Sequence, residues 1–236
     1  MRLTSFPSGG LAVVVGASGG IGAAVAAAIG SSGRFAHVIE ASRSGQPSYD
    51  ITREDHVAAL AEKVKASGHD LRLAFDATGY LHGAQGGPEK SWSAIDPAAL
   101  AHQFAVNTIG PALLIKHLLP LFSRDGKAVF ATISAKVGSI SDNQLGGWYG
   151  YRSAKAALNQ IVKTASIELA RKRPEAICLA LHPGTVATPL SDPFAKNGIR
   201  LQTPQESAAS MLQVINNAST AQSGQLVAYD GKVLPY

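Results

Sequence analysis

The sequence predicts an α/β fold with one doubly wound, mostly parallel sheet of seven strands and helices on both faces. Segments with strand and helix periodicity alternate along the whole chain, without a repeat or a linker. The first predicted strand, residues 11–15, is continuously apolar, as in parallel sheets covered on both faces. Residues 16–22 then carry four glycines and lead into an alanine-rich run, which indicates a strand, a tight turn and a helix.

This glycine turn is suited to a dinucleotide. Gly16 can take a positive φ that a residue with a Cβ would resist. The helix that follows offers unpaired N–H groups and a partial positive charge to a diphosphate. The sequence therefore predicts a Rossmann-type nucleotide-binding domain.

Length and composition narrow the class of protein further. A chain of 236 residues suits a single domain over residues 1–236, and one cysteine fits a reducing compartment, so we expect a cytoplasmic protein. The basic residues are scattered despite the net charge of +5, and the histidines lack ligand spacing, so neither nucleic acid nor a metal is expected. Glycines interrupt the apolar stretch 11–29, so we predict no membrane span there.

Each element follows from its own pattern. Apolar or β-branched runs predict the strands, which are residues 11–15, 37–41, 49–51, 71–77, 128–134, 176–182 and 225–228. After the first helix, Thr52 is expected to cap a helix to residue 66, and Pro97 to open a long helix to residue 120. Further helices are predicted at 149–171 and 203–217. Loops are predicted at 80–96 and 135–147, with a substrate lid at about 185–203.

Doubly wound sheets bind ligands beyond the carboxyl ends of their strands. The loops after Val15, Ala41, Ala77, Ser134 and His182 should therefore meet at one edge of the sheet. They carry the glycine turn, an arginine, a further glycine, a serine-rich stretch and a Pro-Gly pair.

Tyr151 and Lys155 lie four residues apart on a predicted helix and share a face. A phenol has a pKa near 10, and an ammonium within about 4–6 Å favours its ionised form. A pKa near 7 would need about 4 kcal/mol of differential stabilisation, so a cationic cofactor ring or oriented hydroxyls would have to assist. The pair is a candidate for acid–base chemistry.

Four motifs stand in order along the chain: VGASGGIG at 15–22, VNTIG at 106–110, YRSAK at 151–155 and HPGT at 182–185. Together they resemble the short-chain dehydrogenase/reductase family over essentially the whole chain. Residues 138–158 resemble most the branch of C-factor and sniffer-type carbonyl reductases. The resemblance implies an oxidoreductase that moves a hydride reversibly between a nicotinamide cofactor and a carbonyl or secondary alcohol.

The resemblance also implies roles for single residues. Tyr151 would be the general acid or base, and Lys155 would hold the nicotinamide ribose and lower the phenol's pKa. Ser134 would bond the carbonyl oxygen, and Asn107 would hold a water that links Lys155 to solvent. The implied cofactor-binding set is Gly16, Ser18, Gly19, Gly20, Ile21, Gly22, Arg43, Asp50, Ala77, Thr78, Gly79, Asn107, Tyr151, Lys155, Pro183, Gly184, Val186 and Thr188.

Three departures from the family pattern stand out. Residues 76–79 read DATG where the family usually has Asn-Asn-Ala-Gly, and the helix usual between the second and third strands is missing. An ungapped alignment also puts Ala135 at the catalytic serine position. Either a bulge turns Ser134 inward or Ser139 takes the role, and we favour Ser134.

The loop after the second strand bears on the choice of cofactor. Glu40 lies inside that strand, and Ser42-Arg43-Ser44 follow it. A charge-assisted bond from Arg43 to a 2′-phosphate contributes about 1.5–3 kcal/mol, so NADP(H) is predicted, with NAD(H) still possible. No metal is predicted.

Two other function classes stay open. Residues 16–20 also match G-x-S-x-G, so a serine hydrolase using Ser18 with His182 is an alternative, although a nucleophile elbow normally follows several strands. A sensor or signalling protein that binds NADP(H) without turnover is the other.

Partners and substrate can be outlined only broadly. The resemblance implies a homodimer or homotetramer that packs the long helices. Trp148, Pro189, Leu190 and Phe194 suggest an apolar pocket for a small carbonyl compound, with no membrane involved.

Overall fold

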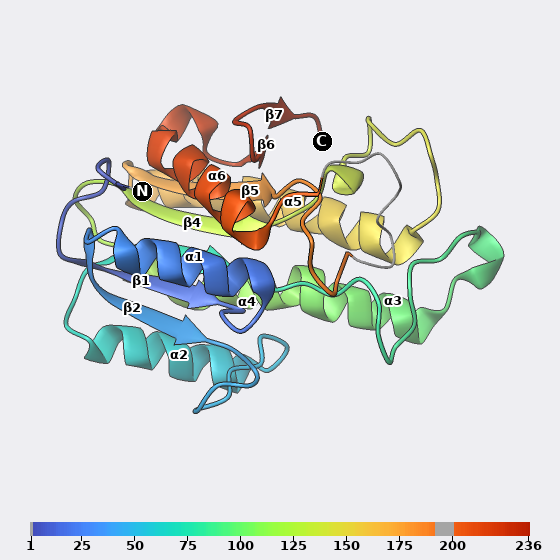
Figure 1. The fold of residues 1–236 in the computed structure, drawn as a ribbon, viewed down its shortest axis with the longest axis horizontal. Coiled ribbons are helices and arrows are strands. Elements are labelled where there is room, and N and C mark those ends of the chain that lie inside the picture. The colour runs from blue at the N-terminus through green and yellow to red at the C-terminus, as the bar shows by residue number, and fades with distance from the viewer. Residues whose placement is uncertain (1, 192–200) are drawn as a thin grey trace.

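One sheet runs through the centre of the protein (Figure 1). The computed structural model describes residues 2–191 and 201–236. The sheet has seven strands in the order β2-β1-β3-β4-β5-β6-β7. Their bounds are β1 Gly10–Val15, β2 Phe35–Ala41, β3 Leu71–Asp76, β4 Ala128–Ile133, β5 Ala176–His182, β6 Gln225–Ala228 and β7 Val233–Leu234. All neighbouring pairs are parallel except β6 with β7, which confirms the predicted doubly wound, mostly parallel sheet.

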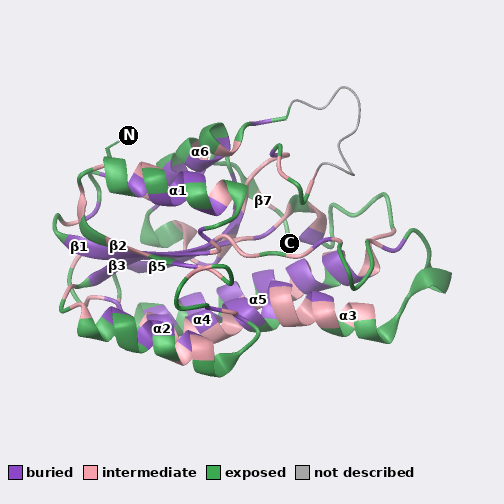
Figure 2. Cartoon of the chain, turned by 60° about the horizontal axis from the view of Figure 1, so that its bottom comes forward, coloured by how far each residue is buried: buried purple, intermediate pink, exposed green. Residues whose placement is uncertain are grey.

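Helices cover both faces of the sheet (Figure 2). Helices α1 (Gly20–Ser31) and α6 (Pro204–Asn217) pack together on one face, and α2 (Glu54–Ala66), α4 (Gly110–Leu118) and α5 (Tyr149–Lys172) cover the other. Helix α3 (Pro97–Phe104) continues through a π-helical turn, Ala105–Ile109, into α4. Short 3₁₀ turns lie at Trp92–Ala94, Leu119–Leu121, Lys136–Gly138 and Thr220–Gln222.

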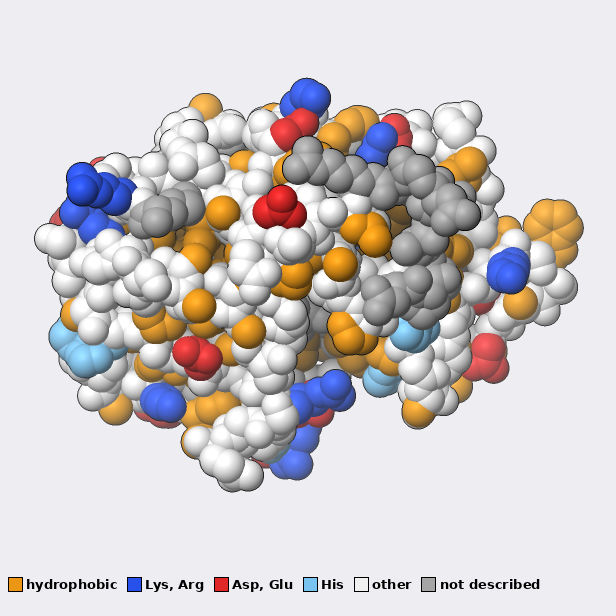
Figure 3. Space-filling view, viewed as in Figure 1, with side chains coloured by type: hydrophobic (Ala, Val, Ile, Leu, Met, Phe, Trp, Pro, Cys, Tyr) orange, Lys and Arg blue, Asp and Glu red, His pale blue; other side chains and the backbone are white. Residues whose placement is uncertain are grey.

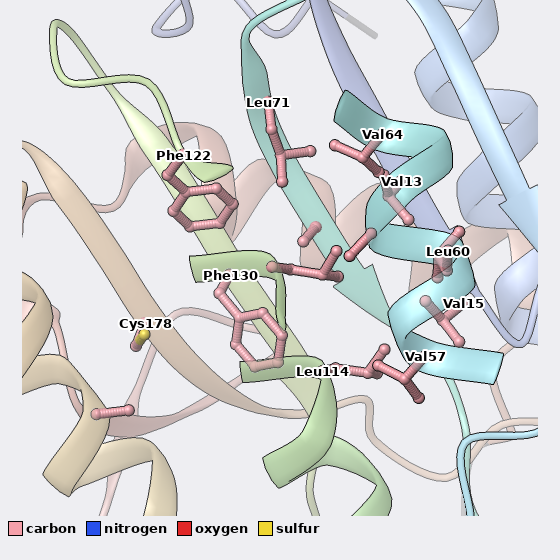
Figure 4. Packing of buried hydrophobic residues seen from close by; sticks show 14 of the residues in the cluster. Val13, Val15, Val57, Leu60, Val64, Leu71, Leu114, Phe122, Phe130 and Cys178 are labelled. Atoms are coloured by element: carbon pink, nitrogen blue, oxygen red, sulfur yellow. The ribbon is translucent and has the colours of Figure 1, made fainter. Parts of the chain in front are cut away.

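The side chains of each strand alternate between two cores. Val13 and Val15 of β1 pack with Val57 and Leu60 of α2, whereas Val14 faces the α1 and α6 side. Figure 4 shows the first of these clusters. The periodicity of the sequence predicts that Val57, Leu60, Ala61 and Val64 share one apolar face of α2, and the structure buries all four.

The chain leaves β1 toward β2 on one side and reaches β3 on the other side through α2. The direction of winding therefore reverses at β1. In such sheets the ligand crevice lies outside the carboxyl ends of the strands at this switch point. The fold thus directs a ligand toward the ends of β1, β2 and β3.

The predicted strand at 49–51 is wrong, and the seventh strand is β7. Seven residues separate Ala41 from Tyr49, whereas a parallel neighbour needs a crossover of about a dozen or more. Tyr49 and Ile51 are instead buried in the core beside α2. As a result β2 forms one edge of the sheet.

Two other local predictions need correction. Helix α2 begins at Glu54 after Arg53, and the Thr52 hydroxyl donates to Asp50 Oδ1 at 2.7 Å instead of capping the helix. The long helix from Pro97 is not continuous, because the π-helical turn interrupts it. In the described part of the chain, the stretch Pro97–Leu121 is long and apolar enough to cross a membrane by length and composition. This stretch packs against α2 and α5, and 39% of its most apolar window is buried inside the protein.

Candidate active site

The glycine turn closes tightly against the start of α1. Gly16 has a φ of +80°, and an added Cβ would lie 3.0 Å from the Ala77 carbonyl carbon. A Cβ on Gly22 would lie only 2.1 Å from the Gly16 oxygen. The N-cap residue of α1 is Gly19, which has no side chain to cap the first turn, so the first N–H groups of the helix are suited to binding an anion.

A pocket of about 330 Å³ lies at the ends of β1, β2 and β3. It is lined by Gly16, Ser18, Gly19, Ser42, Arg43, Ser44, Tyr49, Asp50, Ile51, Thr52, Ala77, Thr78, Gly79, Tyr80, His102 and Val106. The structure thus brings together eight of the sequence-predicted cofactor residues, namely Gly16, Ser18, Gly19, Arg43, Asp50, Ala77, Thr78 and Gly79. Tyr80 and His102, whose rings meet edge to face at 4.5 Å, were missed, because no motif marks them.

The lining of this pocket carries opposite charges. Arg43 is exposed just after the end of β2, and Asp50 lines the same pocket near enough to feel its charge. Burial alone would raise the pKa of Asp50, but hydrogen bonds from Thr52 and the nearby Arg43 charge hold it below its usual range. Arg43, together with Ser42, Ser44 and Thr52, thus offers a cation and hydroxyls to a polar, anionic group.

Tyr151 and Lys155 stand on consecutive turns of α5, and both are buried. Lys155 Nζ donates to the Ile133 carbonyl at 2.7 Å and lies 5.8 Å from the centre of the Tyr151 ring. Burial raises the pKa of Tyr151 to about 12, so the expected lowering is not seen in the chain alone. Burial also lowers the pKa of Lys155 to about 8, although the electrostatic interaction with Asp76 favours the charged form and opposes this decrease.

Asp76 is a buried carboxylate at the end of β3. Its oxygens accept bonds from the Thr132 hydroxyl at 2.7 Å and from the Thr78 amide at 3.0 Å. Burial raises the pKa of Asp76, although these bonds and the Lys155 charge oppose the shift. The acid that stands in place of the family's usual asparagine thus provides a negative charge near Lys155.

Asn107 lies in the π-helical turn and is fully buried. Its Oδ1 accepts from the Tyr80 N–H at 3.0 Å, and its Nδ2 donates to the Tyr80 carbonyl at 2.8 Å and to Gln103 Oε1 at 2.7 Å. The side chain thereby holds the start of the loop after β3. Its expected role in holding a water remains a prediction.

The two candidate serines lie in different surroundings. The Ser134 hydroxyl is buried and donates to Asn159 Oδ1 at 2.7 Å. Ser139 is also buried, and its oxygen accepts from the Asp142 N–H at 3.2 Å. Ala135, between them in sequence, is half-buried. In the described residues, no hydrogen bond joins either serine to Tyr151.

The remaining cofactor candidates follow β5 or lie in α1. Ile21 belongs to α1 behind the glycine turn, beside Gly20 and Gly22. A Cβ on Gly20 would lie 3.2 Å from Thr188 Cγ2, so the start of the predicted lid reaches the turn. Pro183 and Gly184 follow β5, and Val186 pairs with Gln202, which closes the base of that loop. These residues lie outside the lining of the pocket at the ends of β1, β2 and β3.

Of the described residues that are predicted to line a substrate pocket, Trp148 contacts the Tyr151 ring. Trp148 lies 6.2 Å from Tyr151, ring centre to ring centre, and Pro189 and Leu190 are exposed. The Pro189 carbonyl bonds His82 Nε2 at 3.1 Å, so the loop after β3 touches the start of the lid. Phe194, predicted to line an apolar pocket, lies outside the described residues.

The chain resembles known proteins over most of its length. A family model described as enoyl-(acyl carrier protein) reductase matches residues 16–231. A 1-hydroxy-2-glutathionyl-2-methyl-3-butene dehydrogenase of a Rhodococcus species is 30% identical over 191 residues, 81% of this chain and 80% of that protein. The C-signal protein of Myxococcus xanthus is 34% identical over 143 residues, 60% of this chain and 81% of that protein.

Solved structures share the fold. The NADPH-bound carbonyl reductase from chicken fatty liver superposes with a TM-score of 0.84 at 25% identity, covering 98% of this chain and all of the other. The carbonyl reductase Sniffer of D. melanogaster gives 0.82 at 23% identity, with 97% and 100% covered. Because the family model and the dehydrogenase relative each match most of the sequence, this chain belongs to the short-chain dehydrogenase/reductase family of oxidoreductases.

Proposed function

We propose that the protein is an NADP(H)-dependent reductase that interconverts a carbonyl compound and its alcohol, with Tyr151 as general acid or base. The observation that carries the proposal is the buried pair of Tyr151 and Lys155 beside the end of β4. The glycine turn supports it, because a Cβ on Gly22 would meet the Gly16 oxygen and a Cβ on Gly16 would meet the Ala77 backbone, so glycine at both positions keeps the start of α1 close to the ends of β1 and β3. A nicotinamide cofactor, when bound, supplies or accepts the hydride.

The protein's own part is proton transfer. In reduction, the Tyr151 hydroxyl gives its proton to the carbonyl oxygen as that oxygen gains negative charge, and in oxidation the phenolate takes it back. The Lys155 ammonium, 5.8 Å from the ring centre, stabilises the phenolate that this step leaves. Since burial alone holds the pKa of Tyr151 at about 12, further positive charge or hydroxyls at the site assist ionisation.

A hydroxyl beside Tyr151 would stabilise the developing oxyanion. Ser134 would have to give up its bond to Asn159 to do so, whereas Ser139 would not. The geometry therefore favours Ser139, the alternative to the serine that the sequence favours.

Arg43 supports NADP(H) over NAD(H). It lies with Ser42 and Ser44 at the end of β2, where the adenosine ribose of a bound dinucleotide would lie, whereas Glu40 is exposed within the strand. The chicken reductase with the similar fold binds NADPH. We infer that Arg43 pairs with the 2′-phosphate.

The remaining partners are inferred from the surface. Charged side chains are scattered over the face seen in Figure 3 rather than gathered as a polyanion site requires, so a small molecule is the proposed substrate. An apolar groove of about 490 Å³ between α4 and α5 contains Leu119, Ile161 and Leu169. We infer that a second copy packs there to form a homodimer or homotetramer. The buried, free Cys178 fits the cytoplasm as compartment.

NADPH oxidation at 340 nm tests the proposal, with the wild type beside Tyr151→Phe against aldehydes, ketones and quinones. We expect activity that falls at least about a thousandfold without the phenol. Tyr149→Phe is the matched control, because it removes a half-buried phenol two residues away on the same helix. Tight NADPH binding without turnover would instead favour the sensor. Labelling of Ser18 by a fluorophosphonate would favour the hydrolase, although Ser18 is exposed in the nucleotide pocket.

A further inference from the structure

The helix that carries Tyr151 does not cap its own first turn. Trp148 occupies the N-cap position with a φ of 56° and a ψ of 40°, and its side chain makes no capping hydrogen bond. The first N–H groups of a helix have no partner within the helix, and a buried N–H without a partner is costly. Gly150, directly before Tyr151, is buried and has such an N–H group.

The missing cap comes from another part of the chain. Glu89 lies in the loop after β3, 61 residues before Gly150. Its two carboxylate oxygens lie 3.2 and 3.1 Å from the Gly150 nitrogen and accept its N–H. Glu89 is only 8% exposed, so its charge is held by this amide and the positive end of α5 rather than by water.

The backbone of Glu89 makes a second bond to the same turn. Its carbonyl accepts the Trp148 N–H at 2.5 Å. A bulky residue in the left-handed region is strained and persists where its surroundings hold it. Glu89 therefore holds α5 on both sides of its first residue, Tyr149, and the Trp148 ring in turn meets Tyr151.

The other end of the loop after β3 is hydrogen-bonded to α3 and to the π-helical turn. Tyr80 exchanges two hydrogen bonds with Asn107, and the Leu81 carbonyl accepts from Gln103 Nε2 at 3.3 Å. The loop thus spans from the π-helical turn to the first turn of α5. It projects beside α3 in Figure 1. A Cβ on Gly150 would lie 2.9 Å from Glu89 Oε1, so the close approach depends on a glycine there.

We propose that Glu89 is a positioning residue for Tyr151: its carboxylate caps α5 from outside the helix and fixes the phenol relative to Lys155 and the loop after β3. This inference rests on the proposed reductase function. Glu89 is not among the residues that line the pocket at the ends of β1, β2 and β3, so removing it should misplace the acid without weakening cofactor binding.

The test compares Glu89→Ala, Glu89→Gln and Asp96→Ala for turnover, for NADPH affinity and for amide exchange at the start of α5. We expect Glu89→Ala to lower kcat between about tenfold and a hundredfold, because small misplacements of reacting groups have effects of this size. The NADPH dissociation constant should stay within about twofold, and exchange at Gly150 should accelerate. Glu89→Gln should restore most of kcat, since its amide oxygen can still accept the Gly150 N–H.

Asp96→Ala is the matched control. Asp96 Oδ1 caps α3 by accepting the Ala99 N–H at 2.7 Å, so the variant removes a similar bond at the end of the same loop without touching α5. An equal loss of kcat in Asp96→Ala would overturn the inference, and so would a kcat of Glu89→Ala within about twofold of the wild type.

If Glu89→Ala does not fold, Gly150→Ala tests the positioning role instead. Its Cβ would displace the carboxylate, so the same loss of kcat with unchanged NADPH affinity is expected, and normal kcat would count against the role. An inactive wild type would remove the proposed function and this inference with it. An active wild type that depends on Tyr151 but not on Glu89 would remove the inference alone.

Discussion

The Ser134 hydroxyl donates to Asn159 Oδ1 at 2.7 Å, and both residues are almost completely buried. Asn159 stands eight residues after Tyr151 on α5, which is about 12 Å farther along the helix axis. The bond therefore fixes the serine to a part of α5 well away from the phenol. Ala135 follows it, and the next buried hydroxyl along the chain is that of Ser139.

This arrangement predicts different effects for the two serines. Ser139→Ala should lower kcat about a hundredfold, the usual effect of losing one oxyanion donor. Ser134→Ala should leave kcat within about threefold but lower the free energy of unfolding by about 1–3 kcal/mol, because the Asn159 oxygen loses its donor. Steady-state kinetics and denaturant melts check both. A large loss of kcat in a normally stable Ser134→Ala protein would return the role to Ser134.

Arg43→Ala should weaken NADPH and leave NADH almost unchanged. The lost charge-assisted bond corresponds to an increase of about tenfold to a hundredfold in KM for NADPH. The ratio of kcat/KM for the two cofactors gives the result directly. Arg53→Ala is a suitable control, because Arg53 is exposed nearby and pairs with Asp55. Equal KM values for both cofactors in the wild type would contradict the assignment of Arg43.

Lys155→Met should abolish turnover yet stabilise the fold near neutral pH. The folded protein binds the Lys155 proton more weakly than the unfolded chain, with a pKa of about 8 against the usual 10.5. The stability of the wild type therefore rises with pH between these values, and the variant lacks this rise. We expect the variant to be more stable by up to about 3 kcal/mol at pH 7, with the difference closing toward pH 10.5. Denaturant melts across this pH range measure both free energies of unfolding. If the buried Lys155 charge does not destabilise the fold, the wild type and the variant will show the same dependence on pH.

Gly22→Ala should destabilise the protein and impair NADPH binding. Its Cβ would meet the Gly16 oxygen at 2.1 Å, so the turn and α1 would have to separate. Gly30→Ala lies in the same helix with open space around it, and should stabilise by about 0.5–1 kcal/mol through helix propensity. Melting temperatures and NADPH titrations of the pair distinguish the two effects. Equal melting temperatures and equal NADPH affinities of the two variants would mean that the glycine turn accommodates a Cβ at residue 22 without loss.

Much of the fold could be predicted because it is encoded locally. The unbroken apolar run at 11–15 and the face of Val57, Leu60 and Val64 follow from periodicity alone, and the structure buries both as expected. The glycine turn is equally local, since its strand, its glycines and its helix are adjacent in the chain.

Contacts between distant segments could not be predicted in this way. Glu89 is one charged residue in an irregular loop, and nothing periodic links it to Gly150. The left-handed Trp148 and the π-helical turn at Asn107 also give no signal in composition. The strand predicted at 49–51 had the right residue types, and only the short connection before it argued against pairing.

Because β2 is an edge strand of the sheet, its exposed backbone affects how readily the protein aggregates at high concentration. The outer side of Phe35–Ala41 presents unpaired peptide groups, which form a template that an extended segment of another chain can extend. Polar side chains on this strand, the exposed His37 and Glu40, make its surroundings hydrophilic and oppose such growth. Resistance to aggregation in this protein therefore depends in part on two residues that lie outside the lining of the candidate active-site pocket.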